Sequence, residues 1–142
     1  MSSGVTINDE AMKAARELKA YGACRFVTFK LSADFSEFVV AEKGERGASY
    51  DDFLASLPAD EPRFALYSFE TTAGGGRKFE KLVFIAWKPE SSPVRQKMLY
   101  ATSAQDFKMA LDIASGVEIR ATDTDEISLK AVEARIISST TG

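Results

Sequence analysis

Hydrophobic and polar positions alternate along the chain with two different periods. Spacings of three and four residues predict helices, whereas short runs rich in β-branched and aromatic residues predict strands. Helical spacing predicts helices over about 9–21, 49–57, 93–113 and 126–137. Apolar runs predict strands over about 24–31, 35–40, 63–70, 82–87 and 117–121. The order of these elements predicts a central mixed sheet covered by helices on both faces.

Local signals mark where several of these elements begin and end. Ser49 is a favourable N-cap for the second helix, and Ser92 followed by Pro93 is a favourable start for the third. Three consecutive glycines within 71–76 predict a turn between two strands. The run 82–87 is almost entirely apolar, which is typical of a strand buried on both faces.

A single domain is expected to account for residues 1–142. This length suffices to bury a core, and no internal repeat or long linker divides the chain. Residues 1–5 are predicted to form a flexible arm, and 138–142 a frayed tail. The expected fold class is therefore α+β, a three-layer α/β/α sandwich around a mixed sheet of five or six strands.

The helix predicted after Pro93 has two different sides when its residues are placed at intervals of about 100°. The inner side carries its larger apolar residues, with Leu99, Tyr100, Ser103, Phe107, Ala110 and Leu111. The outer side carries Val94, Lys97, Met98, Ala101, Ala104, Gln105 and Lys108, with Arg95 at its edge. Apolar residues rimmed by charge are common in protein interaction sites. The pattern also fits a helix buried on both sides, or isolated exposed apolar residues.

Several stretches of the sequence resemble the actin-depolymerising factor/cofilin family. The strand and turn at 81–89 (KLVFIAWKP) lead into 92–103 (SPVRQKMLYATS), which resembles the long actin-binding helix of that family. The strand at 63–70 and the opening Ser3-Gly4-Val5 also resemble the family, in the same order along the chain. The resemblance implies binding to monomeric actin, preferably in its ADP state, and to filaments. It also implies filament depolymerisation and severing.

The family resemblance further implies particular contact residues. Those for both monomeric and filamentous actin are Ser3, Gly4, Val5, Arg95, Lys97, Met98 and Lys108. Those specific to the filament are Lys78, Lys81 and Arg135. Arg95, Lys97 and Lys108 match residues that also bind phosphoinositide head groups, and Ser3 matches a regulatory phosphorylation site. A phosphate on Ser3 would add about −1.5 to −2 charges and is expected to weaken actin binding.

The implied filament surface departs from the family pattern more than the monomer surface does. Phe79 stands where a basic residue is usual, and Ala134 and Ser138 stand where an acidic and a basic residue are usual. Ala104 and Gln105 replace a Lys-Asp pair in the long helix. We therefore expect monomer binding with weaker filament binding or severing. Two alternatives stay open: a module of the same fold that does not sever filaments, and a regulatory protein that binds phosphoinositides.

The composition argues against several classes of function and chemistry. The net charge of −3 argues against a general nucleic-acid binder. The chain has no histidine and a single cysteine, Cys24, so it lacks the commonest general base and cannot form an internal disulfide. Neither zinc, nor another cofactor, nor catalysis is expected. The acidic pair Asp51 and Asp52 is interpreted as capping or solvated, and the glycines of 74–78 lack the spacing of a phosphate-binding loop.

The same features predict where the protein acts and with what. No apolar stretch approaches the length needed to cross a membrane, and the N-terminus lacks the pattern of a signal peptide. We expect a monomer in the cytoplasm and on the cytoskeleton. The expected partners are actin and phosphoinositide head groups.

Overall fold

The computed structural model describes residues 4–21, 24–72, 78–113 and 116–141 of the chain. Within these ranges one sheet is formed by β1 (Thr6–Ile7), β2 (Phe26–Leu31), β3 (Glu37–Gly44), β4 (Arg63–Thr72), β5 (Lys78–Trp87) and β6 (Val117–Ala121). The helices are α1 (Asp9–Tyr21), α2 (Tyr50–Ala55), α3 (Val94–Ala110) and α4 (Leu129–Thr141), with the 3₁₀ helix η1 (Thr124–Ile127) before α4.

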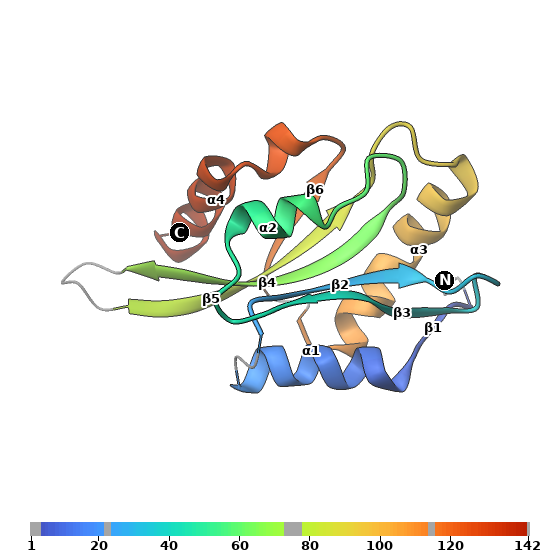
Figure 1. Ribbon diagram of the computed structural model, residues 1–142, viewed down its shortest axis with the longest axis horizontal. Helices are drawn as coiled ribbons and strands as arrows, with labels where there is room; N and C mark the ends of the chain where they lie inside the picture. Colours follow the sequence, from blue (N-terminus) through green and yellow to red (C-terminus); the bar gives the residue numbers. More distant parts are fainter. Residues whose placement is uncertain (1–3, 22–23, 73–77, 114–115, 142) are drawn as a thin grey trace.

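The sheet runs in the order β1-β3-β2-β4-β5-β6 and is mixed (Figure 1). β1 pairs with β3, and β5 with β6, in parallel, whereas the other neighbours are antiparallel. β4 and β5 pair along their whole lengths, from Arg63 opposite Trp87 to Thr72 opposite Lys78. The apolar run 82–87 therefore lies in an interior strand, as its pattern predicts.

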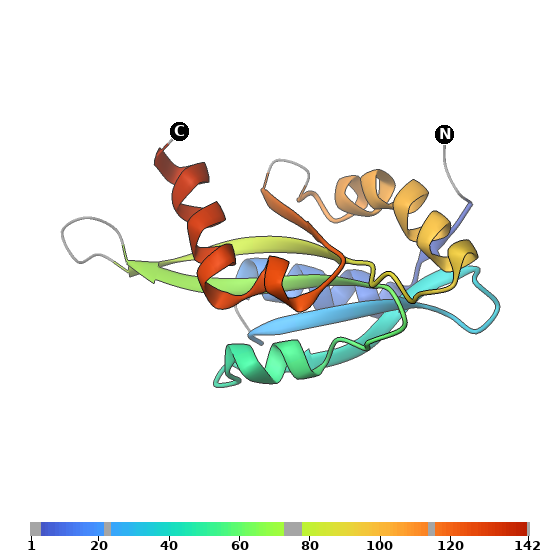
Figure 2. The same ribbon diagram turned by 90° about the horizontal axis from the view of Figure 1, so that it is seen from above.

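Helices cover both faces of this sheet (Figures 1 and 2). α1 and α3 pack on one face, and α2, η1 and α4 pack on the other. Side chains of β4 alternate between the two cores, because Phe64 and Leu66 face α1 and α3 while Ala65 and Tyr67 face the opposite layer. The predicted α+β sandwich with helices on both faces is confirmed.

Local contacts explain where α2 begins and where α3 ends. The Ser49 hydroxyl accepts a hydrogen bond from the Asp52 N–H, and the Ser49 N–H donates to the Asp52 carboxylate, so the predicted N-cap of α2 is confirmed. α3 stops at Ala110, short of the predicted end near 113. It stops there because Asp112 adopts a left-handed backbone with φ of 57°, which a helix cannot continue through.

α4 differs from the prediction at both ends. It begins at Leu129, because the chain first forms η1, whose N-cap Asp123 accepts a hydrogen bond from the Glu126 N–H. It also continues to Thr141, through most of the segment predicted to fray. Residue 142, like residues 1–3 of the predicted arm, lies outside the described ranges.

The strand predicted at 35–40 is displaced along the chain. β3 instead spans 37–44, because its antiparallel pairing with β2 continues past an irregularity between Thr28 and Phe29. Phe35 lies in the preceding turn with φ of 61°. The two-residue β1 was not predicted, since so short a strand has no visible period.

Candidate functional site

Aromatic side chains fix the inner side of α3 against the sheet. Between ring centroids, Phe107 lies 4.7 Å from Phe64 and 5.1 Å from Phe29. Tyr100 is also buried, and its hydroxyl accepts a 2.9 Å hydrogen bond from the Leu31 N–H. Burial raises the pKa of Tyr100 above its ordinary value, so the hydroxyl stays neutral. These contacts hold α3 in one orientation on the sheet.

The outer side of α3 presents apolar side chains to solvent. Val94, Met98 and Met109 are 68%, 62% and 63% exposed, and Ala101 and Gln105 are exposed between them. Steps of three and four residues put all five positions on one side of the helix. We call these five residues the outer α3 surface. The predicted outward orientation of Val94, Met98, Ala101 and Gln105 is confirmed.

Two basic residues flank the outer α3 surface at the N-terminal end of the helix. Arg95 is exposed, and its guanidinium carbon lies 5.0 Å from the centre of the Phe35 ring. Lys97 is half-buried, and its ammonium donates a 3.1 Å hydrogen bond to the Glu90 carbonyl. Both cations thus lie beside Met98, and each is held by a local contact.

Lys108 does not lie on the outer side of α3, and its predicted position was wrong. The residue is only 8% exposed, and its ammonium is paired with the carboxylate of Glu118 in β6. A lysine on the side of a helix next to a strand is buried only with such a partner. Lys108 therefore links α3 to β6, and its ammonium is already paired within the protein.

Glu118 is the centre of a small ionic cluster on β6. Its carboxylate also accepts a 2.9 Å hydrogen bond from the Arg120 guanidinium. Partial burial acts to raise the pKa of Glu118, but hydrogen bonds and charge from Lys108 and Arg120 outweigh it and leave the pKa lowered. The sequence offered no signal for this cluster, because the pairing of Lys108 with Glu118 depends on how α3 is placed relative to β6 in the folded chain.

The N-terminal segment lies beside the C-terminal half of α3. A groove of about 310 Å³ has Val5 on one wall and Asp106 and Ala110 on the other. Val5 is half-buried against the core beneath α1 and α3, and Gly4 before it is exposed with φ of 81°. Ser3 lies outside the described residues. The structure thus brings Gly4 and Val5, two predicted contact residues, next to the long helix.

The residues predicted to contact filaments belong to β5 and α4. Lys81 is half-buried opposite Phe69 of β4. Arg135 is exposed, and its guanidinium donates a 2.9 Å hydrogen bond to the Glu118 carbonyl. Lys78 begins β5, and its side chain lies outside what the structure describes. In Figure 2 α4 lies nearer than α3 to the end of the β4–β5 hairpin, so these residues form a region distinct from the outer α3 surface.

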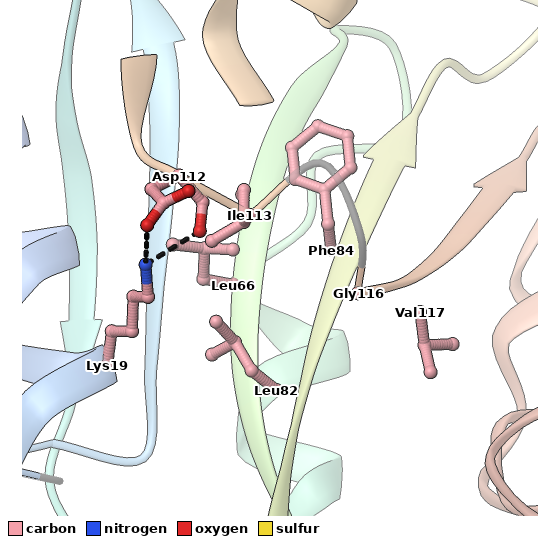
Figure 3. A pocket seen from close by; sticks show the side chains of 8 residues that line it. All are labelled: Lys19, Leu66, Leu82, Phe84, Asp112, Ile113, Gly116 and Val117. Carbon is pink, nitrogen blue, oxygen red and sulfur yellow. Dashed lines mark hydrogen bonds and ion pairs between the residues drawn. The ribbon is translucent and has the colours of Figure 1, made fainter. Parts of the chain in front are cut away.

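The C-terminal end of α3 is fastened to α1. Lys19 donates a 2.6 Å hydrogen bond to the Asp112 carbonyl, and its ammonium lies 3.3 Å from the Asp112 carboxylate (Figure 3). Beside this pair is a cavity of about 170 Å³ with apolar walls that include Leu66, Leu82 and Phe84. The cavity lies between the sheet and the segment that follows α3, which contributes Asp112, Ile113 and Gly116 to its lining, and the ion pair helps to fix that segment. Lys19 and Asp112 are far apart in the sequence, and no sequence pattern predicted their contact.

Several acidic residues of the described part of the chain stabilise local structure. Asp52 and Asp123 cap α2 and η1, in agreement with the interpretation of such residues as caps. In the ranges that the structure describes, no three histidine, cysteine or acidic side chains gather closely enough to hold a metal ion. None of the helices seen in these ranges is both long enough and apolar enough to cross a bilayer.

A mixed sheet between two helical layers, with an exposed apolar stripe on a fixed helix, defines a protein-binding module. Residues 4–137 match the family described as cofilin/tropomyosin-type actin-binding protein. Actin-depolymerizing factor 3 of Zea mays is 43% identical to the chain over 133 residues, which cover 94% of this chain and 95% of that relative. The chain therefore belongs to the cofilin/tropomyosin-type actin-binding protein family, and the predicted family resemblance is confirmed.

Solved structures agree with this assignment. The crystal structure of Streptomyces griseoflavus cofilin matches with a TM-score of 0.81 and 36% identity, over 93% of this chain and 96% of that one. Human coactosin-like protein matches with a TM-score of 0.77 over 98% of this chain and 92% of that one. Its 24% identity shows a shared fold alone.

Proposed function

We propose that this protein binds actin monomers and filaments and promotes filament depolymerisation. The observation that carries the proposal is the outer α3 surface, where Met98 is 62% exposed on a helix fixed from behind by aromatic packing. The relative from Zea mays, which aligns with almost the whole chain, is named an actin-depolymerizing factor. The protein acts by binding and not by catalysis, in the cytoplasm and on the actin cytoskeleton.

Met98 and the two neighbouring cations have different roles in this proposal. Burial of an exposed methionine in an apolar pocket of the partner contributes about 1.5–3 kcal/mol, and its flexible thioether adapts to the shape of that pocket. Arg95 and Lys97 add positive charge at the edge of the contact. Charges at an edge favour an acidic partner surface and mainly raise the association rate.

We expect monomer binding to be stronger than filament binding or severing. The five residues of the outer α3 surface are exposed, although Lys97 at its edge is half-buried and donates to the Glu90 carbonyl. By contrast, Lys81 is half-buried and Arg135 already donates to the Glu118 carbonyl, so both side chains would have to reorganise at a filament contact. Phe79 and Ala134 add no charge there. Filament co-sedimentation as tight as monomer binding would contradict this order.

Two regulatory inputs are proposed to act on the same surface. Phosphorylation of Ser3, two positions before Val5 in the sequence, would add negative charge to the N-terminal segment and weaken actin binding. Phosphoinositide head groups would compete with actin for Arg95 and Lys97. Addition of phosphoinositide vesicles to the complex is therefore expected to release actin.

The central experiment compares two double variants that each remove two positive charges. Arg95→Ala/Lys97→Ala changes the edge of the outer α3 surface, whereas Lys13→Ala/Arg16→Ala changes two exposed residues of α1. The α3 variant is expected to weaken monomer binding, measured by fluorescence, by about tenfold or more, since two charged contacts each contribute about 1 kcal/mol. Filament loss, measured by sedimentation, falls with it, and the melting temperature stays unchanged.

Three outcomes would change the proposal. Absence of actin binding by the folded wild type would contradict it directly. Equal losses in the α1 and α3 variants would mean that total charge, and not the α3 site, governs binding. Filament binding without any loss of filament would favour the alternative of a module that does not sever.

A further inference from the structure

Side-chain hydrogen bonds stabilise the turn between β2 and β3, which lies next to α3. One carboxylate oxygen of Asp34 accepts hydrogen bonds of 2.7 Å from the Ser32 and Ser36 hydroxyls and of 3.1 Å from the Ser36 N–H. These bonds lower the pKa of Asp34 to about 2, so the carboxylate is ionised at neutral pH. The turn is therefore held by a network of its own side chains.

Phe35 stands at the centre of this turn in a strained conformation. Its φ of 61° lies in the left-handed region, where a bulky aromatic residue is rare. The Phe35 N–H donates a 2.9 Å hydrogen bond to the Ser32 carbonyl, which keeps the backbone in that region. The ring is half-buried against the core beneath α1 and α3. Such strain is retained only where the surrounding contacts determine the conformation.

The exposed part of the Phe35 ring meets the guanidinium of Arg95. The 5.0 Å separation from the ring centre is within the range of a cation–π contact. Among the described residues, no carboxylate lies within ion-pair distance of Arg95. The guanidinium keeps its hydrogen-bond donors for a partner, because a cation–π contact uses the face of the group and not its N–H bonds.

A long arginine side chain loses much rotamer freedom when a partner immobilises it. A ring that holds the guanidinium beforehand removes part of that loss. We propose that Phe35 is a positioning residue for Arg95, and that the β2–β3 turn thereby forms a functional part of the actin-binding surface. This inference rests on the proposed function, because it assigns the role of Phe35 at the same site.

A double-mutant cycle tests the proposal, with Phe35→Leu, Arg95→Ala and the combined variant. Phe35→Leu keeps an apolar side chain but removes the aromatic face. It is expected to weaken actin-monomer binding about three- to tenfold in the wild-type background and to have no effect once Arg95 is alanine. The conservative Phe35→Tyr is expected to bind like the wild type. Equal weakening by Phe35→Leu in both backgrounds would overturn the proposal, since the ring would then act independently of Arg95.

An NMR measurement without actin separates this inference from the proposed function. The ring current of Phe35 is expected to shift the Arg95 Nε–H resonance, and the shift should vanish in Phe35→Leu and persist in Phe35→Tyr. If the wild type bound no actin, the proposed function would fail while this readout still reported whether Phe35 orients Arg95. An Arg95 resonance that is the same in the wild type and in Phe35→Leu would overturn the positioning role.

Discussion

α1 and α3 pack on the same face of the sheet, yet their outer sides differ. α1 buries Ala11, Ala14, Ala15 and Leu18 and exposes charged residues, among them Lys13 and Arg16. α3 buries the large rings of Tyr100 and Phe107 but also exposes apolar residues, of which Met98 is 62% exposed. Since both helices meet the same sheet and the same solvent, packing alone does not account for the outer side of α3.

The comparison of α1 with α3 separates two roles of apolar residues, which are packing in the core and contact with a partner. In the described part of α1 the strongly apolar residues Met12 and Leu18 pack in the core, which is the pattern of a helix that only covers a sheet. In α3 the inner aromatic residues stabilise the fold, and the outer apolar residues are exposed, where they can contact a partner. The three predictions below test this division, beginning with the largest expected effect.

Truncation of the inner side of α3 is expected to have the largest effect. Phe107→Ala removes a ring that is 1% exposed and contacts Phe29, Phe38 and Phe64. The free energy of unfolding is expected to fall by about 3–5 kcal/mol, as for other buried phenylalanines. Urea denaturation measures the change. Met109→Ala, on the outer side of the same helix, is the control and should stay within about 0.5 kcal/mol of the wild type.

Removal of the buried cation should have an intermediate effect that depends on pH. Lys108→Ala leaves the Glu118 carboxylate without its buried partner, and the expected loss of stability at pH 7 is about 1–3 kcal/mol. Because the pKa of Glu118 is lowered in the folded protein, the pair stabilises above the ordinary value of 4.5. That contribution disappears as the pH falls through the lowered pKa.

Urea denaturation of the wild type and of Lys108→Ala at pH 7 and at pH 3 measures this dependence. The difference in stability between the two proteins is expected to be smaller at pH 3. A difference of the same size at both pH values would mean that Lys108 contributes by the packing of its methylene groups and not by its charge.

The smallest change in stability, with a clear change in function, is expected for Met98→Ala. Its side chain is exposed, so the free energy of unfolding should move by less than about 0.5 kcal/mol. Affinity for monomeric actin should fall about five- to twentyfold, which corresponds to roughly 1–2 kcal/mol. Fluorescence titration measures it, with Lys13→Ala on α1 as the control. Unchanged affinity would place the contact elsewhere on the molecule.

Much of the fold followed from local patterns. The apolar run 82–87 predicted an interior strand, and Ser49 predicted the start of α2, because both depend on neighbouring residues alone. The outward orientation of Met98 followed in the same way from helical spacing. Errors appeared where the local signal was short or ambiguous, as for the two-residue β1 and for Phe35, which was predicted in a strand and lies in a turn.

The sequence by itself therefore determined the class of fold, the two-sided character of α3 and the family, because periodicity and motifs are local properties of the chain. Only the tertiary structure decided which cations of α3 are accessible. Lys108 is paired with Glu118, whereas Arg95 lies against Phe35 and forms no ion pair with any carboxylate that the structure describes. The physical reason is that the environment of a charge depends on residues that other strands and turns bring near it. The spacing of residues along one helix gives no information about these neighbours.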